Sequence, residues 1–126
     1  MLVWIAVGAG GALGSLARHA VNRLVQHEWP LLRFPLATAV VNIAGCAVIG
    51  LLAGLIASGR LPMRQPWREF VFVGVLGGFT TFSTFGFETI SLVRTGEGAR
   101  ALANVAVQVI VGLGALYAGL AVTQRP

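Results

Sequence analysis

Residues 74–87 read GVLGGFTTFSTFGF, at the centre of an uncharged run from 70 to 87. Two adjacent glycines, which are poor helix formers, precede four hydroxyl-bearing residues within five positions. Ser and Thr are favoured at helix N-termini, where their side chains satisfy unpaired amides. The stretch therefore predicts a helix that breaks at Gly77-Gly78 and restarts near Thr80 and Thr81.

A broken backbone at membrane depth is tolerated only where it is buried in protein or lines a water-filled cavity. The freed carbonyls offer a cation site, and the restarted helix offers amides and the positive end of its dipole. The alternative is that Gly-Gly and the hydroxyls simply allow close helix packing.

Three phenylalanines, Phe79, Phe82 and Phe85, recur every third residue of this stretch and are expected to share one helical face. A phenylalanine stripe usually faces lipid or core, but here it alternates with hydroxyls, so the other face must meet something polar. Aromatic ring edges carry partial positive charge. A desolvated anion can rest against them and still be released, as conduction requires.

The composition places the whole chain in a membrane. Of its 126 residues, 56% are hydrophobic and only 10% are charged, and the mean hydropathy is +0.83, whereas a soluble domain carries roughly a quarter charged residues. A helix needs about 20 apolar residues to cross the hydrocarbon. We therefore expect an all-α membrane protein, a single domain over 1–126, with both termini on one side and four crossings at roughly 2–25, 34–59, 67–93 (with the central break) and 99–124.

Arginine supplies all nine basic residues, and they fall at the edges of apolar runs, as membrane-end anchors do and nucleic-acid-binding patches do not. The side that holds the N-terminus has four and the other side five, namely Arg60, Arg64, Arg68 and Arg125 against Arg18, Arg23, Arg33, Arg94 and Arg100. Arginine bias sets insertion direction, so near-equality predicts insertion both ways up. Two opposite copies can then form an antiparallel, dual-topology homodimer, although counts this small can also be equal by chance.

Amides inside the spans extend the polar inventory. Asn42 lies in the second run and is expected either to donate to a pore or to hydrogen-bond another helix. Asn104 and Gln108, four apart in the last run, share a face and extend the same argument. Glu88 is the one acid near the interior of an apolar run, at the end of the third. Arg18 follows the first run, where its side chain is expected either to snorkel to the membrane interface or to draw anions toward a pore mouth.

The segments 10–18, 42–45 and above all 77–85 resemble the small bacterial fluoride channels, the Fluc or CrcB-type family, and the resemblance covers essentially the whole chain. It implies a dual-topology homodimer in the bacterial inner membrane, with two antiparallel pores that let fluoride leave the cytoplasm passively. By this resemblance Phe82 and Phe85 are the pore phenylalanines, Asn42 is a pore-lining amide, and Ser83 and Thr84 are the hydroxyls beside them.

The same resemblance implies that the backbone carbonyls of Gly77 and Thr80 from both subunits hold a structural Na⁺ at the dimer interface. Arg18 matches the arginine of the family's first helix, at the vestibule. Gln108 stands where several relatives carry Ser, which bears on the fourth-helix part of the polar pathway; Phe79 and His19 also depart from the family pattern.

Two other classes of small membrane protein share features with a channel. A small multidrug exporter shares the size, the four helices and the dual topology, but needs a membrane-embedded Glu in its first helix, and 1–17 contains none. A non-transporting assembly subunit would not require the broken, hydroxyl-rich stretch. The sequence shows no nucleophile–base pair and no set of metal-ligating side chains, so we expect no enzymatic activity.

Overall fold

The computed structural model describes residues 1–124 and is built from helices joined by short connections. The first two long helices are α1 (Leu2–Glu28) and α2 (Leu36–Ala57). The third span is made of four consecutive segments: α3 (Gln65–Arg68), the π-helical η1 (Glu69–Leu76), α4 (Gly77–Phe79) and α5 (Phe82–Arg94). The fourth comprises α6 (Gly98–Ala106), the π-helical η2 (Val107–Val111) and α7 (Gly112–Thr123).

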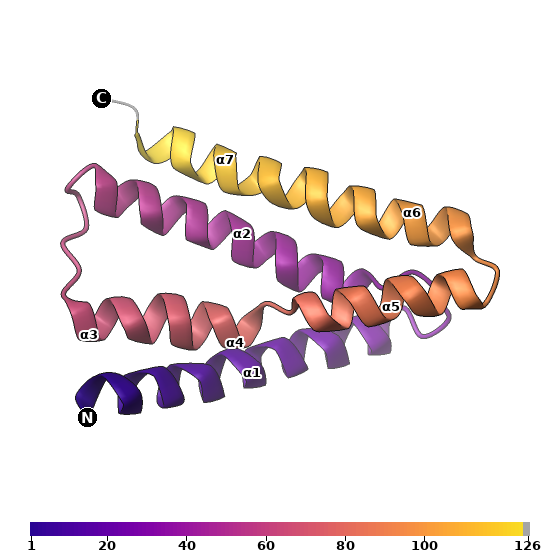
Figure 1. The fold of residues 1–126 in the computed structure, drawn as a ribbon, viewed down its shortest axis with the longest axis horizontal. Coiled ribbons are helices and arrows are strands. Elements are labelled where there is room, and N and C mark those ends of the chain that lie inside the picture. The colour runs from indigo at the N-terminus through magenta and orange to yellow at the C-terminus, as the bar shows by residue number, and fades with distance from the viewer. Residues whose placement is uncertain (125–126) are drawn as a thin grey trace.

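The four long elements run side by side in two pairs (Figure 1). Helix α1 lies along η1 and α4, and α2 lies along α7. The chain runs along the length of the molecule four times, once for each span. The N-terminus and the end of α7 therefore lie at the same end of the molecule, as expected for an even number of crossings. Arg125, which was counted among the arginines of that end, lies outside the described residues.

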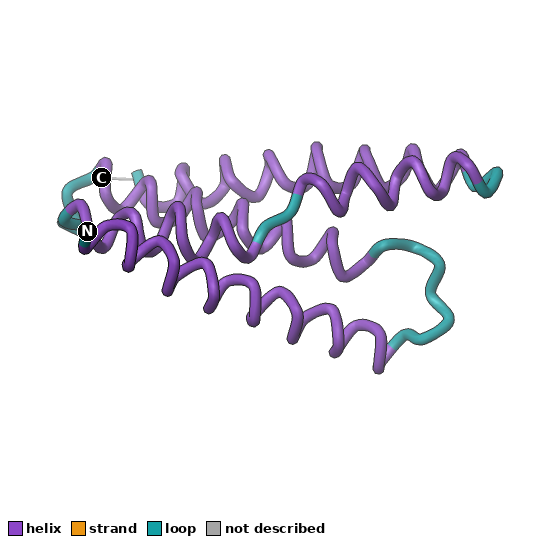
Figure 2. The backbone as a smooth tube through the Cα atoms, turned by 60° about the horizontal axis from the view of Figure 1, so that its bottom comes forward, coloured by secondary structure: helices purple, strands orange, loops and turns teal. Residues whose placement is uncertain are grey.

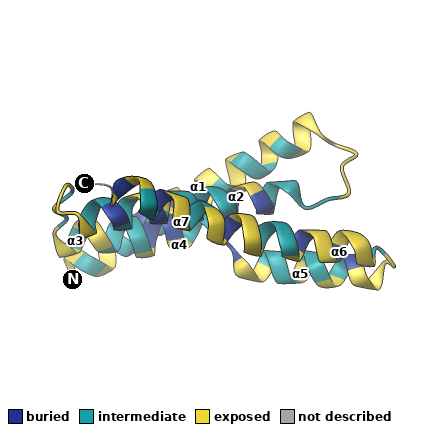
Figure 3. Ribbon diagram, turned by 90° about the horizontal axis from the view of Figure 1, so that it is seen from above, coloured by how far each residue is buried: buried dark blue, intermediate teal, exposed yellow. Residues whose placement is uncertain are grey.

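Three segments within 1–124 are long and apolar enough to cross a membrane, at Leu36–Ala57, Gln65–Arg94 and Gly98–Thr123. Helix α1 is long enough, with 27 residues, but it carries Arg18, His19 and Arg23 and is less apolar. Figure 3 shows exposed residues along all four spans. The exposed residues include large apolar ones, such as Trp4, Leu16, Phe82, Phe87, Ile110 and Tyr117. This exposure is expected where lipid or another protein chain, rather than water, is the neighbour.

The third span is broken, but not at the predicted position. Gly77 and Gly78 lie in α4 with helical geometry, and the extended backbone begins at Thr80 (φ −77°, ψ 157°) and continues through Thr81 (φ −153°, ψ 108°). Figure 2 shows this segment as a loop between two helical halves. Gly78 is instead used for close contact with α1, and the threonines, whose hydroxyls can replace lost helical hydrogen bonds, occupy the break itself.

Close approach between α1 and the first half of the third span depends on glycine. A Cβ on Gly10 or Gly14 would overlap backbone atoms of the third span, and a Cβ on Gly74 or Gly78 would overlap backbone atoms of α1. Small residues at such contacts let two helix backbones approach each other in a membrane. The glycine-packing alternative is therefore correct for Gly78, and it coexists with the break that begins two residues later.

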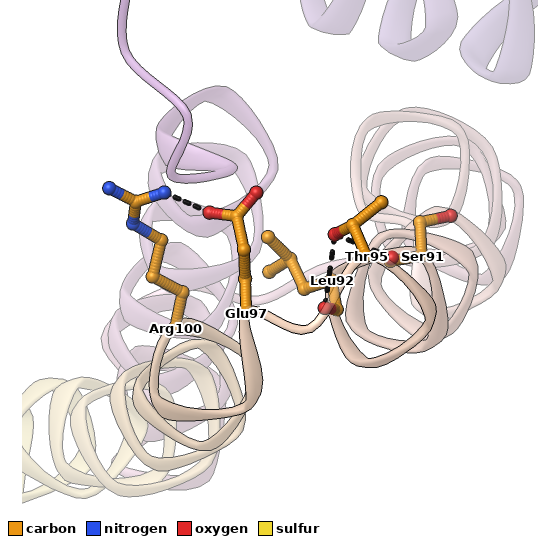
Figure 4. A network of polar contacts seen from close by, with 5 residues as sticks. All are labelled: Ser91, Leu92, Thr95, Glu97 and Arg100. Carbon is orange, nitrogen blue, oxygen red and sulfur yellow. Dashed lines mark hydrogen bonds and ion pairs between the residues drawn. The ribbon is translucent and has the colours of Figure 1, made fainter.

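The connection between α5 and α6 is a compact turn (Figure 4). Gly96 adopts a left-handed conformation (φ +79°), and the Thr95 hydroxyl donates to the carbonyls of Ser91 and Leu92, both at 3.1 Å. Arg100 pairs with Glu97 across the first turn of α6. The turn directs α6 back along α5, and so brings polar residues of the fourth span opposite the break.

Candidate functional site

The break is stabilised locally by Thr81, which caps α5. Its side chain accepts a hydrogen bond from the Thr84 amide at 3.3 Å, and its hydroxyl lies 2.9 Å from the Thr84 hydroxyl and 3.4 Å from that of Ser83. A threonine in this position satisfies one of the unpaired amides at the start of a helix. The predicted restart of the helix at a threonine is thus explained by capping.

Side chains from two other helices satisfy the backbone of the break. Asn42 of α2 binds Thr81 on both sides: its Oδ1 accepts from the Thr81 amide at 2.8 Å, and its Nδ2 donates to the Thr81 carbonyl at 3.1 Å. Arg18 of α1 donates to the Thr80 carbonyl at 3.3 Å. Each replaces a hydrogen bond that an unbroken helix would have made, since a buried backbone group without a partner is costly.

Arg18 therefore lies at the break and not at the end of a helix, because α1 continues for ten residues beyond it, to Glu28. The side chain is half-buried and its charge is directed at a carbonyl oxygen of the third span. The arginine is part of the support of the break.

Two further side-chain amides, those of Gln108 and Asn104, continue the network away from Asn42. Asn42 Nδ2 donates to Gln108 Oε1 at 2.6 Å, Gln108 Nε2 donates to Asn104 Oδ1 at 2.8 Å, and Asn104 Nδ2 donates to Thr89 Oγ1 at 2.9 Å. The Thr89 hydroxyl in turn donates to the Phe85 carbonyl at 2.7 Å. Gln108 lies in η2, and π-helical turns of this kind recur at functional sites.

A cavity of about 270 Å³ opens beside this network. It is lined by Asn42, Cys46, Ile49, Thr80, Thr81, Phe82, Phe85, Gln108 and Val109. Among the described residues that line it, none is charged. The cavity thus combines amides, hydroxyls and aromatic rings with aliphatic walls, a set that can contact a small anion without trapping it.

Two phenylalanine rings form the aromatic part of the lining. The rings of Phe82 and Phe85 lie 5.5 Å apart between centroids with an interplanar angle of 47°, and the Phe82 side chain is strongly exposed, at 82%. Phe79 ends α4 and is separated from them by the break. The expected three-residue stripe is therefore not continuous: only Phe82 and Phe85 share a helix.

The structure brings together five of the predicted site residues around this cavity: Asn42, Phe82, Phe85 and Gln108 of the predicted pore, and Thr80 of the predicted cation site. Within the described chain, the cavity lining does not extend to Ser83 or Thr84, whose hydroxyls instead lie near that of Thr81.

Sequence reasoning missed Thr81 as the residue through which α2 holds the break, and missed Cys46, Ile49 and Val109 as cavity lining. The position of Thr81 directly before the restarting helix was the signal for the cap. The three apolar or weakly polar residues carried no comparable signal.

Gly77 and Thr80 lie at the end of the first half of the span, where their backbone oxygens are candidate cation ligands. The amide that an unbroken helix would direct at the Gly77 carbonyl is that of Thr81, and Thr81 donates to Asn42 instead. Gly77 is exposed in the single chain, and Thr80 is half-buried. Carbonyl oxygens are ligands that hard cations accept, so the chemistry of this pair fits Na⁺.

Glu88 lies one turn beyond Phe85, away from the cavity. Its Oε1 accepts a hydrogen bond from the Thr38 hydroxyl at 2.8 Å, and its Oε2 is buried without a partner among the described residues. Thr38 is itself buried in α2. The contact joins α2 to α5 on the far side of the phenylalanine pair from the break.

The sequence of this chain matches a known protein family. A family model described as CrcB-like protein, Camphor Resistance (CrcB), matches residues 5–120. The chain belongs to the CrcB-like family. The matched region includes both halves of the third span, the amide network and every residue that lines the cavity.

Curated proteins similar to this member of the CrcB-like family carry a functional name. The protein of Paracoccus denitrificans is 47% identical over 119 residues, which are 94% of this chain and 92% of that protein. That of Nitrobacter winogradskyi is 42% identical over 120 residues, 95% and 94% of the two chains, and that of Methylobacillus flagellatus is 46% identical over 116 residues, 90% and 88%. All three are named fluoride-specific ion channel FluC.

These CrcB-like relatives are ion channels and not enzymes, which confirms the expectation that the chain has no enzymatic activity. Together with the three apolar spans, the family also identifies a multi-pass membrane protein.

Proposed function

We propose that this chain is a fluoride-selective channel that lets fluoride leave the cytoplasm passively through the bacterial inner membrane. The observation that carries the proposal is an uncharged cavity of amides, hydroxyls and two phenylalanines at the break of a membrane span. The names of the similar proteins supply the identity of the ion.

Fluoride is small and strongly hydrated, so its passage requires groups that replace its water. Gln108 has one Nε2 hydrogen beyond the one that it donates to Asn104, and the rings of Phe82 and Phe85 bring positive edges. Asn42 and Thr81 add polar groups whose donors are engaged within the chain and would have to exchange partners to contact the ion. A guanidinium in the same place would bind the anion too tightly for rapid release. The acidic Glu88 lies outside the cavity lining, so the proposal needs no coupling to a proton.

The functional unit is proposed to be an antiparallel homodimer with two pores and with α1 as the fourth crossing of each chain. Phe82 and Gly77, at the two sides of the break, are exposed in the single chain, and a second copy would cover them. Because Arg18 lies at the break, the opposite end keeps four arginines (five minus one), equal to the four that the order of spans in the sequence assigns to the other end. Equal charge at both ends favours insertion in either direction, which labelling of a single introduced cysteine from both faces of the membrane would detect.

A structural Na⁺ is proposed where the two breaks meet, held by the carbonyls of Gly77 and Thr80 from both copies. The Gly77 carbonyl lacks its usual helical donor, and the Thr80 carbonyl has a second lone pair beside the one directed at Arg18. The cation would thus satisfy backbone groups that neither copy satisfies alone.

Protein prepared with Na⁺ replaced throughout by a bulky organic cation is therefore expected to lose both its dimer and its fluoride flux. The dimer fraction is read from light scattering after size-exclusion chromatography, and readdition of Na⁺ should restore it. Full activity and an intact dimer in the rigorous absence of Na⁺ would count against the cation site while leaving the channel proposal in place.

Fluoride efflux from liposomes tests the function directly. Purified protein is reconstituted into vesicles loaded with fluoride, and efflux is followed with a fluoride electrode beside parallel vesicles loaded with chloride. We expect rapid fluoride efflux that needs no proton gradient, and little chloride efflux. Equal rates for the two ions, or no fluoride efflux, would exclude a fluoride-selective channel.

A further inference from the structure

We propose that Asn104 and Thr89 are positioning residues of the pore, acting with Asn42 and Gln108 as one hydrogen-bonded clip. The clip runs from Asn42 through Gln108 and Asn104 to Thr89. Its residues come from α2, η2, α6 and α5, so it links three of the four spans.

The direction of every hydrogen bond in the clip follows from its two ends. At the first end the Thr81 amide can only donate and the Thr81 carbonyl can only accept, which fixes the orientation of the Asn42 side chain. At the second end the Phe85 carbonyl can only accept, so the Thr89 hydroxyl donates to it and must accept from Asn104. Gln108, between them, has only one orientation that serves both neighbours.

Both ends of the clip hydrogen-bond to the same short stretch of backbone. Thr81 is the cap of α5, and Phe85 lies one turn later, so the stretch between them is the first turn of α5 and carries the rings of Phe82 and Phe85. The Phe82 ring has few other restraints within the described chain, since it is 82% exposed, whereas Phe85 is half-buried. The clip therefore sets where the two rings stand relative to the cavity.

The clip also engages both hydrogens of the Asn42 side-chain amide. Its Nδ2 carries two hydrogens, one given to the Thr81 carbonyl and the other to Gln108. An anion can take the second hydrogen only by displacing Gln108 Oε1. Groups held in place before the ion arrives favour the ion whose size they match, because they cannot relax around a larger one.

The inference rests on the proposed function, and its test separates the two. Asn104 is fully buried, at 0% exposure, and neither it nor Thr89 lines the cavity, so an effect of either on ion selection must be transmitted through the clip. Fluoride and chloride efflux are measured for Asn104→Leu, Thr89→Val, Gln108→Met and the double variant Asn104→Leu with Gln108→Met. Failure of the wild-type chain to conduct fluoride overturns the function; wild-type conduction with unaltered variants overturns only the clip.

We expect each single variant to lower the fluoride-to-chloride ratio about tenfold, the order of effect of one lost buried hydrogen bond. The fluoride-to-chloride ratio of the double variant should fall no further than that of the more affected single variant, because either substitution alone already breaks the chain of hydrogen bonds. Thr123→Val is the matched control: Thr123 is buried and donates to the carbonyl four residues earlier, as Thr89 does, but belongs to α7 and not to the clip. Its ratio should equal that of the wild type.

Additive losses in the double variant, or an unchanged ratio in Thr89→Val, would overturn the proposal. Thr89→Val exchanges one hydroxyl for a methyl group, so it decides the question even if Asn104→Leu does not fold. The dimer fraction is recorded for every variant, and a fall in selectivity counts in favour only where that fraction equals the wild-type value.

Discussion

Phe82→Ile is expected to lower fluoride efflux at least about tenfold, which corresponds to roughly 1.4 kcal/mol of barrier height. Isoleucine keeps the side chain apolar but removes the polarised ring edge and the contact with the Phe85 ring, whose centroid is 5.5 Å away. The folded state should change little, because the Phe82 side chain is largely exposed in the chain. Efflux from liposomes and the dimer fraction are measured on the same preparation.

Phe87→Ile is the matched control for this experiment. Phe87 lies on the same helix and is exposed to a similar extent, at 75%, but is not part of the cavity lining. Its efflux should equal that of the wild type. Equal efflux from the two variants would show that the ring of Phe82 has no special part in conduction.

Asn42→Ala is expected to have the largest effect, with fluoride efflux lowered at least about a hundredfold, or roughly 2.7 kcal/mol. Interhelical hydrogen bonds in membranes are worth only about 0.6 kcal/mol on average, because other partners replace those that are lost. Thr81 is different because it is buried, at 8% exposure, and its backbone is extended. Without Asn42, no helical hydrogen bond is in place to satisfy the Thr81 amide and carbonyl. The cost should approach about 1–3 kcal/mol for each unpaired group.

A fluorescence-detected thermal melt should show the same variant to be less stable than the wild type. Asn22→Ala serves as its control, since the described chain shows no hydrogen bond from Asn22, which lies in α1. Wild-type efflux and melting temperature in Asn42→Ala would mean that the break does not depend on the amide.

The sequence predicted the helical class and the existence of a break, because both follow from composition and from short-range propensity. The position of the break did not follow, since Gly77-Gly78 has the lower helix propensity but Gly78 packs against Gly11 of α1. That contact stabilises a continuous helix through the two glycines, and the break lies instead at Thr80 and Thr81. Tertiary contacts of this kind cannot be read from propensity.

For the site, the chemical types were predictable and their partners were not. Asn42, Phe82, Phe85 and Gln108 were singled out because amides and hydroxyl-flanked rings are unusual in a span, and the structure gathers them at one cavity. Arg18 was expected at a pore mouth because it follows the first apolar run, whereas its side chain reaches the break of the third span. Such pairings depend on which helices are neighbours in the fold. The sequence of one chain does not give that arrangement.

The partners of the break are encoded upstream of it. Arg18 and Asn42, which hydrogen-bond the Thr80 and Thr81 backbone, precede the third span in the sequence and are synthesised before it, and Gln108 is synthesised after it. The nascent chain thus reaches the most costly stretch of its insertion with two of the necessary hydrogen-bonding groups already synthesised, and the last span then completes the site.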